Sequence, residues 1–202
     1  MSTAATVAVI VLGYALGTFP TAVLVGRRLG FDPTTAGSGN PGASNATRIG
    51  GLRAGAVVLL GDAGKGALAA GIGLATQGRL LAWLAGAAAV IGHLWPITRR
   101  LRGGKGVATA AGAAVVSAPL AFAPLAVVFA VLVKLTGRAA IGSIAIAALL
   151  PLSVGLVGRP APEVAVAAAL GAVVIVRHRE NIGRLARGEE GSVRPGSGEP
   201  IG

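Results

Sequence analysis

The sequence predicts an all-α integral membrane protein with seven transmembrane helices, its N-terminus outside and its C-terminus in the cytoplasm. Of the 202 residues, 53% are hydrophobic and only 12% are charged, which is too little polar surface for a soluble domain of this length. The apolar residues also fall in long blocks, several of which reach the roughly 20 residues needed to cross a ~30 Å hydrocarbon core. These blocks are residues 5–25, 54–75, 80–97, 107–133, 139–157 and 164–176.

The first three blocks each predict one span. No Lys or Arg precedes the first block in Met1-Ser2-Thr3, so we expect a retained helix and not a signal peptide with a basic start. The second block carries Asp62 and Lys65, and such charges inside a span either serve function or form an ion pair that holds helices together. The third block ends near His93, which is next to Trp95, and we expect His93 to be a residue of the membrane interface.

The distribution of positive charge divides the fourth block into two spans. A break at Ser117-Ala118-Pro119 gives seven spans, with fifteen Lys and Arg residues on one side and only Arg79 and Arg159 on the other. A single long helix gives six spans and a split of nine against eight. The positive-inside rule favours the first arrangement. The fourth and fifth spans are then short, and we expect them to be tilted or supported by neighbours.

We expect residues 1–187 to form a single seven-span domain, and residues 188–202 to be a flexible cytoplasmic tail because they are rich in Gly, Pro, Ser and Glu. The 33 glycines favour close helix packing. The net charge of +11 lies beside the spans, so orientation and anionic headgroups explain it better than nucleic acid. The chain has no cysteine and only two distant histidines, so no disulfide and no metal site is expected.

The predicted topology brings three polar segments to the cytoplasmic side, of which the first is residues 37–48. It matches the dinucleotide pattern G-x-G-x-x-G, but it follows a membrane span and contains Pro41, whereas the fingerprint requires a strand before it. An ordinary re-entrant turn is one alternative. We favour a nest of backbone N–H groups for an anion, with Arg48 as a planar donor suited to phosphate and with side-chain partners Ser38, Asn40, Ser44 and Asn45.

The other two segments also have features of anion sites. Gly103, Gly104 and Gly106 surround Lys105 but lack the following Ser or Thr of a nucleotide-binding P-loop. Glycines allow close backbone approach to a ligand, and a helix beginning near Val107 would direct N–H groups at an anion. A simple positive-inside anchor is the alternative. His178 and Asn181 are three residues apart on one helical face, which suits acid–base or phosphate-binding chemistry, although an isolated histidine there could be merely interfacial.

From Leu12 to Glu190 the chain resembles the bacterial membrane acyl-phosphate:glycerol-3-phosphate acyltransferases, the PlsY family. Departures are mild: Trp95 stands where Phe is usual, Ser44 where Thr is usual, and the stretch before Gly103 is unusually rich in arginine. The resemblance rests on motifs in the family's order: Gly17-Thr18-Phe19-Pro20-Thr21-Ala22, residues 37–45 with Arg48, Asp62 with Lys65-Gly66, Gly92-His93-Leu94-Trp95-Pro96, residues 103–109, Arg138 with Gly142-Ser143, residues 177–182, Arg184-Leu185 and Gly188-Glu189.

The resemblance implies transfer of an acyl group from acyl phosphate to the 1-hydroxyl of sn-glycerol 3-phosphate, giving lysophosphatidic acid and phosphate in the first acylation step of phospholipid biosynthesis. It implies no cofactor and no use of acyl-CoA. The family lacks the H-x-x-x-x-D motif of other glycerolipid acyltransferases, and neither histidine here is followed five residues later by Asp. The implied catalytic residues are Ser38, Arg48, Lys105, His178 and Asn181; the implied substrate-binding residues are Gly37, Gly39, Asn40, Gly42, Ser44, Asn45, Gly103, Gly104, Gly106 and Ser143.

Among these residues, we expect Arg48 and Lys105 to bind phosphates, and Ser38 and Asn181 to orient substrate or stabilise an oxyanion. His178 is the candidate base or a phosphate ligand. The expected partners are glycerol 3-phosphate, a long-chain acyl phosphate and membrane lipids, in a multi-pass protein of the cell membrane with a cytoplasmic-facing site. The alternative is a small membrane anion transporter, which would also use basic, glycine-rich half-helices. It predicts polar residues on both faces, and the outward loops carry few.

Overall fold

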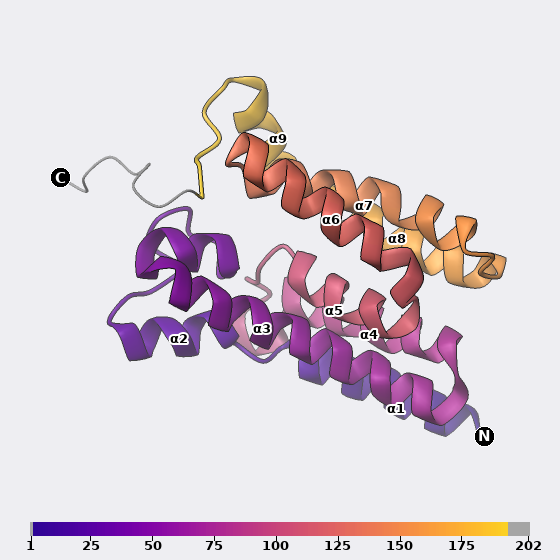
Figure 1. Cartoon of the computed structure of the whole chain (residues 1–202). Helices are drawn as coiled ribbons and strands as arrows, with labels where there is room; N and C mark the ends of the chain where they lie inside the picture. Colours follow the sequence, from indigo (N-terminus) through magenta and orange to yellow (C-terminus); the bar gives the residue numbers. More distant parts are fainter. Residues whose placement is uncertain (1, 194–202) are drawn as a thin grey trace.

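The computed structural model describes residues 2–193, and all regular secondary structure in that part of the chain is helical (Figure 1). A short 3-10 helix, Ile97–Arg99, follows α4. The α-helices are α1 Thr3–Gly17, α2 Thr21–Leu29, α3 Ala43–Gln77, α4 Arg79–Leu94, α5 Val107–Ser117, α6 Pro119–Thr136, α7 Ala139–Leu156, α8 Ala161–Arg177 and α9 Arg179–Ala186.

The first predicted span is broken in the structure. The α-helix ends at Gly17 and resumes at Thr21, because Pro20 lacks an N–H and disfavours helical geometry in the residue before it. The two helices together still make one apolar stretch of 27 residues, Thr3–Leu29. At the break the carbonyl oxygen of Phe19 accepts two hydrogen bonds, from the N–H of Thr21 and from Lys65 of α3, both at 3.1 Å.

Helix α3 is kinked at Gly51, whose φ of +78° is outside the helical range and suits only glycine without strain. The kink separates residues 43–50, which carry Arg48, from the apolar remainder of the helix. Beyond it, α3 packs very closely on α5. A Cβ on Gly66 would collide with the carbonyl oxygen of Thr109, and one on Gly112 with that of Ala63. Small residues therefore set this crossing, as the glycine content predicted.

The predicted break in the fourth apolar block is confirmed: α5 ends at Ser117 and α6 begins at Pro119. At 11 residues, α5 is about 16 Å long and does not span a bilayer by itself. In the described part of the chain five helical stretches are long and apolar enough to cross a membrane, and a sixth results if α8 and α9, bent by 56°, count as one span. The multi-pass helical architecture is therefore shown.

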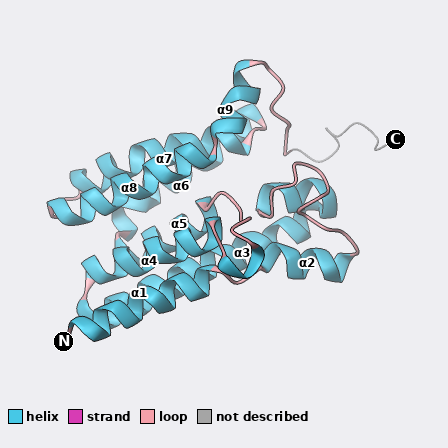
Figure 2. Ribbon diagram, turned by 180° about the vertical axis from the view of Figure 1, so that it is seen from behind, coloured by secondary structure: helices cyan, strands magenta, loops and turns pink. Residues whose placement is uncertain are grey.

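The helices form two groups (Figures 1 and 2). Helices α6, α7 and α8 lie together, and α1, α3, α4 and α5 form the other group; α4 contacts α8 and α5 contacts α6 across the boundary. Trp83, Leu94, Ile146 and Leu170 belong to one buried apolar cluster that joins the groups. Many large apolar side chains on the outside remain exposed, including Leu120, Val127, Val131 and Leu135 of α6, as expected for a surface in contact with lipid.

The chain after α9 returns to the body of the protein. In residues 188–193 the N–H of Val193 donates to the carbonyl of Gly137 at 2.8 Å, and the side chain of Glu190 is buried. Part of the predicted flexible tail therefore contacts the body of the protein, because Glu190, Gly191, Ser192 and Val193 pair with polar groups of α3, of α9 and of the loop between α6 and α7. The rest of the predicted tail, residues 194–202, lies outside the described residues.

Candidate active site

A cavity of about 250 Å³ lies between the two groups of helices. One end is polar, lined by Ser38, Arg48, Lys105, His178 and Asn181 among others; the other end is apolar, lined by residues such as Val107, Ala111, Phe122, Phe129 and Ile146. A second, smaller apolar cavity shares Val107, Phe122 and Ile146 with it and continues toward Leu150 and Leu170. The site therefore suits a molecule with a charged head and an apolar chain.

The first polar loop is shaped by Asn45, at the start of α3. Its amide nitrogen donates to the carbonyls of Pro33 and Ala36, both at 3.0 Å, and its amide oxygen accepts the N–H of Ser38 at 2.9 Å. Gly37 and Gly39 both have positive φ. Because the Asn45 side chain is fully engaged, it shapes the loop that presents Ser38 and Asn40 to the cavity.

The second polar loop lies directly on the end of α4. The N–H of Gly104 donates to the carbonyl of His93 at 3.2 Å, and a Cβ on Gly103 would collide with that same carbonyl oxygen. Arg177 holds the loop from the other side by donating to the carbonyls of Gly103 and Gly104 at 3.4 and 3.1 Å. The glycines are thus required by close packing, and they hold Lys105 at the cavity.

Lys105 lies outside the membrane-spanning helices and is partly buried. Burial in less polar surroundings lowers its pKa to about 8, and Glu190 opposes this as the next largest influence. Such a lysine is cationic at neutral pH, yet it is less strongly hydrated than a surface lysine. It can therefore bind a phosphate oxygen strongly.

The third polar segment is the bend between α8 and α9. The buried side chain of His178 has its Nδ1 2.8 Å from the carbonyl oxygen of Val174. A carbonyl oxygen can only accept, so Nδ1 carries the hydrogen and Nε2 of the neutral ring keeps its lone pair. Asn181 is also buried, and its Oδ1 has no hydrogen-bond partner in the described part of the chain. Both side chains can bind polar hydrogens in the cavity.

Glu190 is a cavity residue that sequence reasoning missed. Its carboxylate accepts hydrogen bonds from Asn181 Nδ2 at 2.7 Å and from Arg184 Nε at 2.8 Å, and Arg48 Nη2 lies 4.0 Å away. Arg48 also donates to the carbonyls of Gly191 and Ser192. Nothing in the low-complexity composition of this segment could have indicated that one of its glutamates is buried.

A second group that the sequence left unexplained is the charged pair in α3. Lys65 Nζ lies 2.8 Å from Asp62 Oδ1 and 2.8 Å from Nδ1 of His93. The expectation that His93 is merely interfacial is wrong, because only 4% of it is exposed and it lines the cavity together with Asp62. In the sequence, only the two charged residues inside a predicted span, Asp62 and Lys65, indicated that a polar group lies here.

The structure brings most of the predicted site residues together. Gly39 and Gly103 line a smaller polar cavity that also includes Ser38, Lys105 and Arg184, and Gly37 and Gly104 shape the two loops. Ser143 donates to the carbonyl of Ala139 at 2.8 Å and lines both the main cavity and the smaller apolar cavity. The predicted residues lining the main cavity are Ser38, Asn40, Gly42, Ser44, Asn45, Arg48, Lys105, Gly106, Ser143, His178 and Asn181.

Comparison with known proteins identifies the family to which the chain belongs. Residues 7–188 match the sequence profile of the family described as glycerol-3-phosphate acyltransferase. The chain belongs to the glycerol-3-phosphate acyltransferase family. It is 39% identical to the glycerol-3-phosphate acyltransferase of Rubrobacter xylanophilus over 91% of this chain and 93% of that one. It is 41% identical to that of Myxococcus xanthus, over 92% and 98% of the two chains.

Two crystal structures of PlsY, an integral membrane glycerol 3-phosphate acyltransferase, have the same fold. One is the glycerol 3-phosphate form, with a TM-score of 0.89 and 31% identity. The other is the lysophosphatidic acid form, with a TM-score of 0.86 and 30% identity. Each comparison covers 93% of this chain and 95% of the other. This glycerol-3-phosphate acyltransferase therefore shares both the sequence family and the helical architecture of an integral membrane acyltransferase.

Proposed function

We propose that this acyltransferase moves an acyl group from a long-chain acyl phosphate to the 1-hydroxyl of sn-glycerol 3-phosphate. The products are lysophosphatidic acid and inorganic phosphate. The observation that carries the proposal is a cavity lined by cationic and hydrogen-bonding groups and by apolar side chains, which shares lining residues with a second, apolar cavity. Both substrates carry a phosphate, and the donor also carries the apolar chain.

The chemistry requires no cofactor. The oxygen of the 1-hydroxyl attacks the acyl carbon, a new ester C–O bond forms, and the C–O bond between the acyl carbon and the phosphate breaks. The hydroxyl proton leaves either to the departing phosphate or to Nε2 of His178, which is the ring nitrogen free to accept it. Acyl phosphate is an activated mixed anhydride, so positioning and charge stabilisation can supply much of the rate.

We assign the polar residues by their chemistry. Lys105 and Arg48 bind the substrate phosphates, and the first-turn N–H groups of α5 add donors for an anion. Ser38 and Asn181 orient the substrates or stabilise the developing oxyanion. Arg48 donates to the carbonyls of Gly191 and Ser192. These two hydrogen bonds hold the guanidinium at the edge of the cavity, and its remaining N–H groups can donate to a ligand.

For the membrane we propose a seven-segment topology with the N-terminus outside and the C-terminus in the cytoplasm. The cluster of Lys and Arg at the end of the molecule that carries the polar loops supports it, since positively charged loops stay in the cytoplasm. The active site then faces the cytoplasm of the cell membrane, where a water-soluble acceptor can reach it. The anion transporter considered from sequence explains the cationic loops but not the adjoining apolar cavity.

The donor preference tests the proposed reaction. Purified protein in lipid nanodiscs is given radiolabelled glycerol 3-phosphate with either palmitoyl phosphate or palmitoyl-CoA. We expect labelled lysophosphatidic acid from palmitoyl phosphate and none above background from palmitoyl-CoA. The reverse preference, or no product from palmitoyl phosphate by protein that is folded and monodisperse, would reject the proposed donor.

A further inference from the structure

The polar cluster beneath the glycine loop has a specific hydrogen-bonding order. The ammonium of Lys65 has three hydrogens, and the structure supplies three acceptors: Asp62 Oδ1 at 2.8 Å, His93 Nδ1 at 2.8 Å and the carbonyl oxygen of Phe19 at 3.1 Å. Lys65 forms an ion pair with the Asp62 carboxylate, and an ammonium group has hydrogens to donate but no lone pair, so Nδ1 of His93 accepts. The hydrogen of the neutral imidazole is therefore on Nε2.

The alternative tautomer has no suitable partner. If Nδ1 carried the hydrogen, it would point at the Lys65 ammonium, which cannot accept. The carboxylate of Asp62 lies 3.6 Å from Nδ1, farther than a good hydrogen bond allows and farther than the lysine. The cluster thus fixes His93 as an Nε2–H donor.

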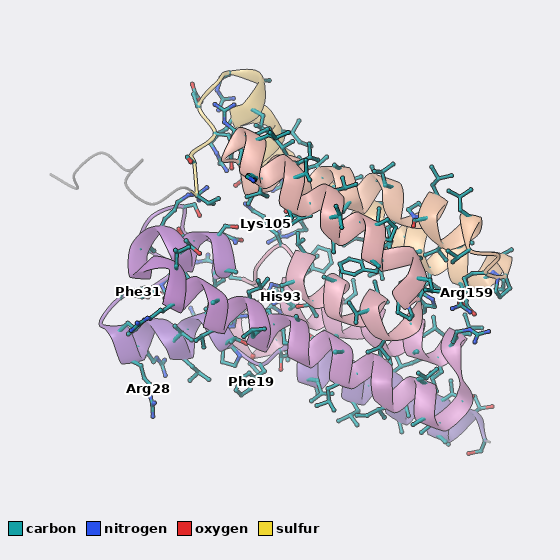
Figure 3. The ribbon with its side chains drawn as sticks, in the orientation of Figure 1. Phe19, Arg28, Phe31, His93, Lys105 and Arg159 are labelled. Carbon is teal, nitrogen blue, oxygen red and sulfur yellow. The ribbon has the colours of Figure 1, made fainter. Side chains whose placement is uncertain are left out.

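That donor is directed at the loop that carries Lys105. A Cβ on Gly104 would collide with Nε2 of His93, so the edge of the ring lies against the backbone one residue before Lys105. No residue in the described part of the chain accepts a hydrogen bond from Nε2. His93 is almost fully buried and lines the same cavity as Lys105; Figure 3 labels both in the central region of the molecule.

We propose that His93 is a substrate-binding residue whose Nε2–H donates to a phosphate oxygen held by Lys105 and the N-terminus of α5. Asp62 and Lys65 are positioning residues, since they act through the His93 ring. The proposal rests on the acyl transfer proposed above, because that reaction is what brings a phosphate to this cavity. Lys65 also offsets the negative charge of Asp62, which would otherwise repel the phosphate.

The two histidines then have complementary roles at one cavity. His178 has its hydrogen on Nδ1 and offers a lone pair at Nε2, whereas His93 has a lone pair on Nδ1 and offers a hydrogen at Nε2. The Nε2–H of His93 can donate a hydrogen bond to an anion although the imidazole ring is neutral. One ring can therefore accept a proton while the other holds an oxygen, and neither has to change its tautomer during turnover.

The chain offers a clean spectroscopic test, because it has only two histidines. Protein with ¹⁵N-labelled histidine is examined by NMR in lipid nanodiscs, first alone and then with glycerol 3-phosphate or palmitoyl phosphate added separately. We expect one Nε2–H ring and one Nδ1–H ring, the Nε2–H signal being absent from His93→Gln protein. One of the two substrates should shift that signal, and the substrate that does so identifies the phosphate that is bound. An Nδ1–H tautomer for His93, or an Nε2–H signal that neither substrate moves at saturating concentration, would overturn the proposal.

Measuring KM and kcat of two matched variants separates a loss of substrate binding from a loss of folded protein. His93→Phe keeps a ring without a donor, and His93→Gln restores an N–H near the position of Nε2. We expect His93→Phe to raise KM for one substrate roughly 10- to 100-fold, the usual range for a lost hydrogen bond to a charged group, with a smaller change in kcat. His93→Gln should recover much of that loss. Unchanged KM values for both substrates in His93→Phe would contradict the proposal, and if that variant misfolds, the wild-type NMR result decides.

The Lys65→Met variant tests the positioning role. Without the lysine, Nδ1–H of His93 can turn to Asp62, so we expect the NMR signal to change from the Nε2–H to the Nδ1–H form or to a mixture. A purely structural role for Lys65 would lower stability without that change. If no lysophosphatidic acid is formed from either donor by wild-type protein, the proposed reaction fails, whereas the tautomer and the substrate-induced shift are measured independently of turnover.

Discussion

Lys105 is the residue whose charge should control the pH dependence of the reaction. Burial lowers its pKa to about 8, so the side chain is cationic below that pH and neutral above it. Because phosphate binding needs the cation, we predict that kcat/KM falls as the pH rises through about 8. Lys105→Arg should retain its activity to a higher pH, since a guanidinium stays charged throughout this range. The measurement is kcat/KM for glycerol 3-phosphate between pH 6.5 and 9.5.

A neutral side chain provides the control for that profile. Lys105→Met should lose roughly 10- to 100-fold in kcat/KM at pH 7, the range expected for a charge-assisted hydrogen bond, and its remaining activity should not fall through the same step. If Lys105→Arg shows the same decrease near pH 8 as the wild type, another group titrates there and the assignment is wrong.

Glu190 and Glu189 are neighbours with very different surroundings. Glu190 is buried and accepts from Asn181 and Arg184, whereas Glu189 forms an exposed pair with Arg187, of a kind that contributes little. We predict that Glu190→Ala lowers the thermal midpoint by several degrees, because it leaves buried donors without an acceptor. Glu189→Ala should leave the midpoint within about 1 °C. Equal midpoints for the two variants, measured by thermal unfolding of detergent-solubilised protein, would contradict this account of the C-terminal segment.

At the scale of single residues, sequence reasoning found the loop residues but not the side chains that support them. Lys105 and Arg48, which line the cavity, were predicted because cations and glycines between apolar spans indicate a bound ligand. Glu190 and His93 were not, because their roles come from long-range packing: Glu190 meets α3 and α9 only after the chain folds back, and His93 meets Lys65 only when α3 and α4 lie side by side. The charged pair in α3 was noticed, but its histidine partner was not.

At the scale of helices, the crossing of α3 and α5 depends on two glycines. A Cβ on Gly66 would collide with the backbone of α5, while Gly64, two residues earlier on the same helix, has no atom within 4 Å of such a Cβ. We predict that Gly66→Ala lowers stability by about 1–3 kcal/mol, as overpacking usually does. It should also lower activity, since α5 follows directly after Lys105.

The Gly64→Ala variant is the matched control for that crossing. Replacing an uncrowded helical glycine by alanine should be neutral or stabilise the protein by up to about 1 kcal/mol. Denaturant titration and specific activity of both variants test the prediction. Full stability and activity in Gly66→Ala would mean that the helices can separate at this point without consequence.

Helix boundaries were predicted correctly where a single residue, such as proline, strongly disfavours continuing the helix. Ser117-Ala118-Pro119 separates α5 from α6 as expected, because proline begins a helix readily but does not continue one. The break before Thr21 was missed although Pro20 was visible, since the apolar pattern continues through it. The kink at Gly51 was also missed, because a glycine within a helical pattern does not reveal the sign of its φ.

At the scale of the whole molecule, the topology can be mapped directly because the chain contains no cysteine. Single cysteines are placed at Gln77 and Ala161, at the end of the molecule away from the polar loops, and at Arg28 and Arg100, at the end that carries them. We predict that a membrane-impermeant thiol reagent labels the first pair on intact cells, and the second pair only after the cells are opened. Labelling of Arg28→Cys or Arg100→Cys on intact cells would place the active site on the wrong side.

The overall architecture was largely predictable because hydrophobic blocks and positive charge both follow from the bilayer. What the sequence could not supply is how the two helix groups enclose a cavity, since that depends on the close contacts of α4 with α8 and of α5 with α6. Family membership shows that the chain is a glycerol-3-phosphate acyltransferase, and we propose this cavity, with its polar and apolar lining, as the site of the acyl transfer.

The most direct test of this account is the stoichiometry of the reaction in purified protein. Palmitoyl phosphate and glycerol 3-phosphate are supplied together, and inorganic phosphate and lysophosphatidic acid are measured in the same samples over time. We predict equal amounts of the two products, no phosphate above background when glycerol 3-phosphate is left out, and a decrease of both products in Lys105→Met. Phosphate released without acceptor, or lysophosphatidic acid formed without equal phosphate, would contradict direct transfer between the two substrates in this cavity.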